Sequence, residues 1–380
     1  MFDKAEMLHR AALLAGLTDY GEPSFEEALE RLLYSAQHEA GLNARGIDIF
    51  HDEVIRLLSN RLVLVNEWKT NPTLADEDIE RPLFILGLPR SGTSILHELL
   101  AQDIENRVPL TWETTRLTAG SGHEPQREEE TISQTENEFL QIDKIIPDFK
   151  KIHRIGALFP DECVAFMNND FKSMHFHVCY KLPKFQKWLD RSSFADVYRS
   201  HKQQLQRLQS RKRGVQWVLK SPQHLWKLDA LLEVYPDAHL VQLHRDPVDS
   251  VASYASLVHS LRRAVSDVQD PREIGHEWAE YFALGLKKTM EFRNKLEGRN
   301  PFLDIPYREF MDDPVRMIGR IYIHCGRTLT PTAAEKMKYY MRSHPADMFG
   351  EHRYKLADFG LDLDEERERF QSYRQEFIVI

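Results

Sequence analysis

Leu83-Phe-Ile-Leu-Gly-Leu-Pro-Arg-Ser-Gly-Thr-Ser94 joins a short apolar run to a segment of helical character. The run Leu83–Leu86 has the length and composition of a buried strand. Gly87 and Gly92 bound the turn that follows, and Ser94–Leu100 reads as a helix. At such a turn the backbone N–H groups and the helix dipole point at one place, which suits a phosphate or sulfate group. This stretch therefore predicts a strand, an anion-binding loop and a helix.

The same alternation recurs later in the chain and indicates the fold class. The recurrences are Gln216–Leu219 with Ser221–Tyr235, Ala238–Leu243 with Pro247–Ala264, and Phe302–Ile305 with helices after it. Short strands that alternate with helices are typical of a parallel sheet covered on both faces. We therefore predict an α/β fold, a parallel sheet flanked by helices.

Two regions do not follow this alternation. Residues 1–80 read as a helical extension, with a capping box at Ser24-Phe-Glu-Glu27 and a helix over Ile47–Trp68, ahead of an α/β domain at 81–380. The extension carries no recognisable chemistry, so we expect it to pack or to support a homo-oligomer. Residues 103–214 form an aromatic-rich insertion. An insertion at the carboxyl edge of a parallel sheet predicts an acceptor pocket, and a local core beneath a cap is the alternative.

Composition narrows the class of partner and the compartment. The 380 residues carry a net charge of −9, which argues against a nucleic-acid partner. A few cationic side chains in one cleft can still attract a small anion. Three scattered cysteines indicate a reducing compartment, so we expect a cytoplasmic protein. We see no signal peptide and no apolar run of about 20 residues, and expect no integral membrane protein.

The loop sequence resembles a known family. Pro89-Arg-Ser-Gly-Thr93 is similar to the 5′-phosphosulfate loop, Pro-(Lys/Arg)-Ser-Gly-Thr, of sulfotransferases that use 3′-phosphoadenosine 5′-phosphosulfate (PAPS). An ATP-type P-loop has lysine where Thr93 stands, and here the cation, Arg90, precedes the glycine. The resemblance implies a P-loop-like three-layer fold, PAPS as co-substrate and no metal ion. It also implies that the donor's 5′ end is bound by five loop residues, namely Arg90, Ser91, Gly92, Thr93 and Ser94.

A second segment resembles the same family's 3′-phosphate site. Leu240–Ser253 reads as a strand end, a turn capped by Asp246, and a helix that begins at Pro247. The resemblance implies that Arg245 and Ser253 bind the 3′-phosphate.

Two weaker matches follow, and the resemblance covers about residues 82–119 and 215–360. Tyr307–Pro314 is similar to a segment of the family whose tyrosine lies near the adenine. The resemblance therefore implies that Tyr307 contacts the adenine of the donor. Arg353–Gly360 is similar to a basic segment that closes over the 3′-phosphate. This segment adds three phosphate donors, Arg353, Tyr354 and Lys355. One departure is Ile95, which stands where many relatives have an adenine-stacking tryptophan.

Sulfonate transfer needs cations for the developing charge and a base for the acceptor. The resemblance implies Lys220, at the end of a predicted strand, as a second cation beside Arg90. The family's histidine base falls on Pro222 here. Glu113, near the glutamate base of the tyrosylprotein branch, is the predicted base, and His224 is the alternative.

These residues predict a PAPS-dependent sulfotransferase that acts on a hydroxyl or amine of a small-molecule or lipid acceptor. A small-molecule kinase that uses ATP and a non-catalytic nucleotide-binding relative are the alternatives. His175-Phe-His-Val-Cys179 would place three metal ligands on one face of a strand, but the sequence offers no fourth ligand. We therefore expect no metal site.

Overall fold

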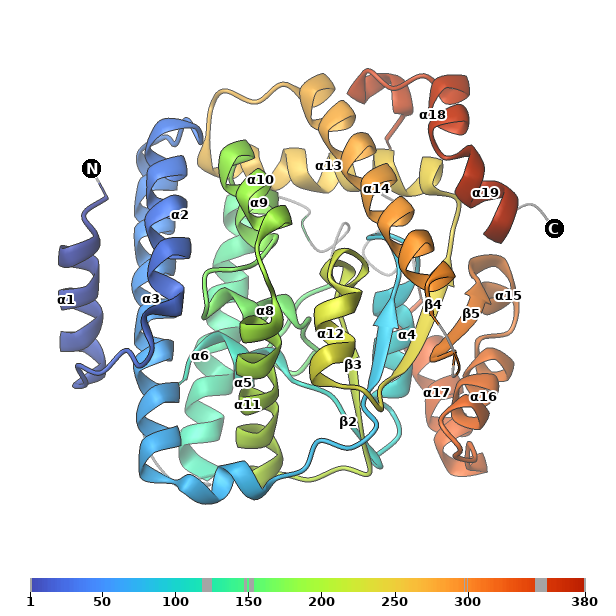
Figure 1. The fold of residues 1–380 in the computed structure, drawn as a ribbon, viewed down its shortest axis with the longest axis horizontal. Helices are drawn as coiled ribbons and strands as arrows, with labels where there is room; N and C mark the ends of the chain where they lie inside the picture. The colour runs from blue at the N-terminus through green and yellow to red at the C-terminus, as the bar shows by residue number, and fades with distance from the viewer. Residues whose placement is uncertain are drawn as a thin grey trace.

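A five-stranded parallel sheet forms the centre of the molecule (Figure 1). The structure, a computed structural model, describes residues 2–117, 125–146, 149, 154–296, 298, 300–345 and 354–378. The strand order is β2-β3-β1-β4-β5, and each neighbouring pair is parallel. The strands are β1 (Leu83–Leu86), β2 (Asn106–Arg107), β3 (Gln216–Lys220), β4 (His239–His244) and β5 (Phe302–Pro306). The predicted α/β class is therefore confirmed.

Helices cover both faces of the sheet, and the side chains of β1 show why. Leu83 and Ile85 belong to one apolar cluster, whereas Phe84 and Leu86 belong to another. Successive strand residues point to opposite faces, so a strand that is apolar throughout needs cover on both sides. The first cluster contains buried side chains from α4 (Thr93–Leu100), α15 (Tyr307–Asp312), α16 (Pro314–His324) and α17 (Pro331–Ser343).

The second cluster is larger and includes most of the other helices. They are α8 (Val164–Asn168), α9 (His175–Cys179), α10 (Pro183–Arg191), α11 (Ala195–Arg211), α12 (Leu228–Val234), α13 (Pro247–Val265), α14 (Pro271–Asn294) and α19 (Gln371–Phe377). The 3₁₀ turns η3 (Pro222–Trp226) and η4 (Leu356–Phe359) also contribute to it. None of the helices within the described ranges has the length and apolar character that a bilayer crossing requires.

The N-terminal helices share this second cluster. They are α1 (Lys4–Ala15), α2 (Glu26–His38) and α3 (Ala44–Thr70), and Met7, Leu29 and Leu58 are buried in the same cluster as Phe84. The division at residue 80 thus marks a change of secondary structure within one continuous apolar core, and as a domain boundary it stays a prediction. The predicted capping box is wrong, because a 3₁₀ turn at Pro23–Phe25 leads into α2 without a side-chain cap.

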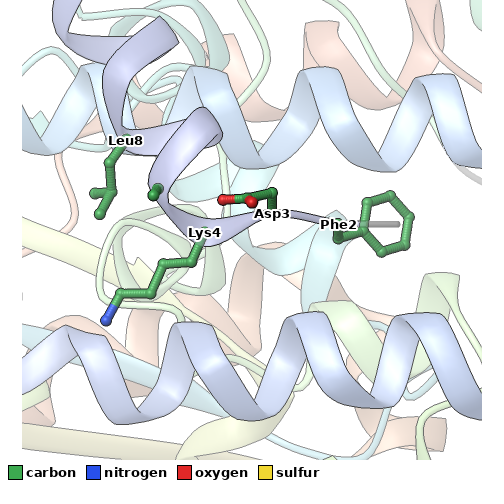
Figure 2. Close-up of a pocket in the computed structure, with 5 residues that line it drawn as sticks. Phe2, Asp3, Lys4 and Leu8 are labelled. Atoms are coloured by element: carbon green, nitrogen blue, oxygen red, sulfur yellow. The ribbon is translucent and has the colours of Figure 1, made fainter.

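A hollow on the outer side of these helices is lined by Phe2, Asp3, Lys4, Ala5 and Leu8 (Figure 2). Lys4 Nζ donates to Glu26 Oε2 (2.5 Å) and to Glu30 Oε1 (2.7 Å) of α2. In Figure 1, α1 lies at one edge of the molecule, whereas α4, which follows the predicted anion loop, lies well across it. The hollow therefore contributes no residue to the predicted site.

The insertion at 103–214 contains β2, α5 (Thr111–Thr115), α6 (Pro125–Ile145) and α8–α11. Phe166, Phe171 and Phe176 are buried there, so these aromatic residues build a local core rather than a wall open to an acceptor. The segment expected to present metal ligands as a strand is the helix α9. His177 is thereby turned away from its neighbours to accept from Leu182 N (3.0 Å), which corrects the single-face arrangement.

Three buried histidines, His97, His201 and His224, predict that stability falls in mild acid. Burial lowers the pKa of His97 and of His201 to about 3 and that of His224 well below its usual value. The folded protein leaves these rings neutral, whereas the unfolded chain binds protons below pH 6.5. The contribution of these three histidines to stability is therefore present above about pH 6.5 and is lost below it, by about 1.4 kcal/mol per histidine at pH 5.5. His175 acts in the opposite direction and offsets part of this loss because, against the lowering effect of burial, Cys179 and Glu53 raise its pKa.

Urea unfolding at pH 7.0, 6.0 and 5.5 measures this loss. His97→Gln supplies a control, because an amide can replace the ring's bond to Val218 O without titrating. We expect the variant to lose about 1.3 kcal/mol less than the wild type between pH 7.0 and 5.5. Equal stability of the wild type at these pH values would contradict the prediction.

Candidate active site

The loop after β1 adopts a compact left-handed path. Gly92 has φ 89° and Arg90 has φ 68°, so both lie in the region that glycine favours. A Cβ atom at Gly92 would lie 3.0 Å from the Tyr307 ring. One at Gly87 would lie 2.6 Å from Ser91 Oγ. The two glycines therefore allow the loop to fold tightly against its own turn and against Tyr307.

The loop hydroxyls have different roles. Ser91 is buried, and its Oγ donates to Leu88 O (2.6 Å), which stabilises the turn. Thr93 is buried at the first position of α4, whose N-cap Gly92 supplies no side-chain cap. The first N–H groups of α4 are thus free of a side-chain acceptor at the cap, as an anion site requires. Ser94 Oγ accepts from Lys220 Nζ (3.1 Å) at the end of β3.

The structure brings the two predicted phosphate segments together. Arg90 Nε donates to Ser253 Oγ on α13 (3.1 Å), and Arg245 Nη1 donates to Arg90 O (2.8 Å). The Arg245 guanidinium lies 4.7 Å from the centroid of the Tyr307 ring. These four residues come from three distant segments of the chain and form one contact group at the carboxyl edge of the sheet, where open α/β folds bind ligands.

The electrostatics of this group favour an anion. Burial lowers the pKa of the Arg90 guanidinium, and the positive charge of Arg245 lowers it further. Arg245 Nε is buried and makes no hydrogen bond to any residue that the structure describes, and Asp249 Oδ2 is 3.9 Å away. A phosphate or sulfate bound here would stabilise the neighbouring guanidinium groups of Arg90 and Arg245 and would give Arg245 Nε an acceptor.

The C-terminal basic segment is only partly described. Arg353 lies outside the described residues. Tyr354 lies close enough to Arg90 to act on its pKa, in the upward direction. Lys355 is exposed at the N-cap of η4, where its backbone N donates to Asp358 Oδ2 (2.9 Å). Of these residues, Tyr354 is the one that the structure brings to the loop.

Lys220 connects the loop to a carboxylate that sequence reasoning missed. Besides Ser94, the buried Lys220 Nζ donates to Glu162 Oε1. Glu162 keeps 23% of its side chain exposed, and Cys163 N donates to Lys220 O (2.9 Å), which fixes this segment beside β3. Burial raises the pKa of the neighbouring Asp161. Glu162 is therefore an accessible carboxylate in contact with a predicted catalytic cation.

The two bases predicted from sequence have structural partners. Glu113 accepts from Leu110 N (2.9 Å) at the start of α5, and its other oxygen accepts from Arg107. His224 is fully buried, and its Nδ1 lies 2.7 Å from Tyr198 Oη. Its ring also packs against Phe84. His224 therefore has no surface on which to contact an acceptor in this conformation, and Glu113 already uses both carboxylate oxygens.

Comparison with known proteins agrees with this geometry. Residues 82–331 match the sulfotransferase family. The chain is 23% identical over 288 residues to the omega-hydroxy-beta-dihydromenaquinone-9 sulfotransferase Stf3 of Mycobacterium tuberculosis, which covers 69% of this chain and 67% of that protein.

Two solved structures share nearly the whole fold. The sulfotransferase STF1 of Mycobacterium tuberculosis is 30% identical with a TM-score of 0.86, and the match covers 98% of this chain and 99% of that one. The sulfotransferase STF9 of Mycobacterium avium is 26% identical with a TM-score of 0.90, over 100% of this chain and 98% of that one. The family match over residues 82–331 and the structural matches over nearly the whole chain agree, and the chain belongs to the sulfotransferase family.

Proposed function

We propose that the protein transfers the sulfonate group of PAPS to a hydroxyl or amine of an acceptor. The contact of Arg90 with Ser253 and Arg245 carries this proposal, because it joins the loop for one anionic group to the segment for another. PAPS has anionic groups at both its 5′ and 3′ ends. The Tyr307 ring, in contact with Arg245, offers an aromatic surface for the adenine where Ile95 offers none.

We propose Glu162 as the base in place of Glu113 or His224. Glu162 removes the proton of the acceptor, and the acceptor oxygen or nitrogen then forms a bond to sulfur. The bond from sulfur to the bridging oxygen breaks, and its electron pair stays with the 5′-phosphate of 3′,5′-bisphosphoadenosine. Arg90 and Lys220 stabilise that charge. Support comes from Lys220, which contacts both Ser94 at the loop and Glu162.

The proposed acceptor is an apolar or amphipathic alcohol, including lipid alcohols. The mycobacterial relative is named for an omega-hydroxylated menaquinone, which favours a lipid acceptor. We also propose a cytoplasmic location, supported by three free cysteines, Cys163, Cys179 and Cys325. Self-association stays a prediction.

A transfer assay tests the proposed reaction. The protein is incubated with sulfur-labelled PAPS and a panel of phenols, long-chain alcohols and polyprenyl quinone alcohols. A parallel series contains labelled ATP with Mg²⁺. We expect sulfonate transfer to an apolar alcohol that is unchanged by a metal chelator, because no step uses a metal ion. Phosphate transfer from ATP that depends on Mg²⁺ would contradict the proposal.

A further inference from the structure

The C-terminal helix α19 contacts the two residues that flank Arg245. Tyr373 Oη lies 2.7 Å from His244 Nδ1, and Arg374 Nε donates to Asp246 Oδ2 (3.0 Å). Two consecutive residues of α19 thus contact the residues on either side of Arg245, the residue predicted to bind the 3′-phosphate. In Figure 1 this helix lies near the C-terminus, beside β4 and β5.

The contact at His244 is extensive. Its Nε2 lies 2.7 Å from Asp304 Oδ1 on β5, and its ring stacks on Phe377 at 4.3 Å between centroids and 10° between planes. Burial lowers the pKa of His244. The neutral ring can therefore donate from Nε2 to Asp304 and accept from the Tyr373 hydroxyl at Nδ1. Since His244 is the last residue of β4, this network fixes the strand end that leads into Arg245.

The contact at Asp246 fixes the other side of the turn. Asp246 Oδ1 accepts from Val248 N (3.1 Å) and caps α13, while its Oδ2 accepts from Arg374. One carboxylate thus orients both the start of α13 and the C-terminal helix. Arg245 itself is held by Arg90 O and the Tyr307 ring. Its backbone position accordingly depends on the residues on either side.

We propose that Tyr373 and Arg374 are positioning residues that hold Arg245 in place for the 3′-phosphate. This inference rests on the proposed function, in which Arg245 binds that phosphate. It predicts that α19 sets the preference for nucleotides with a 3′-phosphate over those without one. A helix that served stability alone would affect both kinds of nucleotide equally.

The test compares the affinities of 3′,5′-bisphosphoadenosine and adenosine 5′-phosphate in the full-length protein. We expect Arg374→Ala to raise the Kd of the bisphosphate about tenfold, and Tyr373→Phe about threefold, with less than about a twofold change for adenosine 5′-phosphate. Arg374→Lys should recover part of the loss. Arg369→Ala is the matched control, because Arg369 Nε pairs with Glu366 (3.0 Å) within the same C-terminal segment.

The outcomes separate this inference from the proposed function. If the wild type prefers the bisphosphate and Arg374→Ala and Tyr373→Phe keep the same ratio of affinities, the positioning role is refuted, whatever their unfolding temperatures. If the wild type binds both nucleotides equally, the proposed 3′-phosphate site fails, and this inference fails with it. An altered ratio at an unchanged unfolding temperature supports the positioning role directly.

Discussion

Glu162→Gln is expected to lower kcat about a thousandfold, the size of effect that loss of a general base produces. The amide keeps the shape of the side chain and an oxygen that can accept from Lys220, but it cannot take the acceptor's proton. The affinity for 3′,5′-bisphosphoadenosine should change less than about twofold, because this change leaves Arg90 and Arg245 in place. Steady-state rates and a calorimetric titration of the same preparation measure the two effects.

Glu113→Gln is the matched control for this prediction. It weakens the pair with Arg107, a buried ion pair, so its main effect should be on stability. Turnover per folded molecule should stay within a few-fold of the wild type. The opposite pattern, with an active Glu162→Gln and an inactive Glu113→Gln, would return the role of base to Glu113.

Arg245→Ala is expected to raise the Kd of 3′,5′-bisphosphoadenosine about a hundredfold, equivalent to about 2.7 kcal/mol. The change removes a guanidinium whose buried Nε has no hydrogen-bond partner within the described part of the chain. It also removes the donor to Arg90 O, so the loop loses a contact. Adenosine 5′-phosphate, which lacks the 3′-phosphate, should lose much less affinity.

Arg263→Ala is the control for charge alone, since Arg263 is an exposed arginine on the same helix as Ser253. Its Kd for the bisphosphate should equal that of the wild type within about twofold, because exposed charges contribute little. Equal affinities of Arg245→Ala and Arg263→Ala would place the 3′-phosphate elsewhere.

Local patterns of sequence were sufficient to predict four strands of the described sheet and the turn that joins β1 to α4. β1 is apolar on both faces, and only a strand covered on two sides buries such a run. Asp246 caps α13 as predicted, because an Asp-Pro pair starts a helix by local chemistry. Strand β2 was missed, since its two residues gain their structure from pairing with β3 rather than from their own pattern.

The proposed catalytic centre was harder to predict because tertiary contacts create it. Glu162 has no motif and no fixed spacing from Lys220, and the fold alone brings the two side chains together. His224 lies two residues beyond the family's histidine position, and Tyr198 and Phe84 enclose it. The sequence signal that could have drawn attention to this segment is the acidic Asp161-Glu162 pair within an aromatic-rich insertion.

Calorimetric titration of the wild-type protein with 3′,5′-bisphosphoadenosine, and separately with ATP and Mg²⁺, tests the donor site most directly. The proposed site predicts a single-site isotherm with micromolar affinity for the bisphosphate and much weaker binding of ATP. Thr93 replaces the lysine that an ATP-type loop uses. ATP also lacks the 3′-phosphate that Arg245 is proposed to bind. Binding of ATP without any binding of the bisphosphate would contradict it.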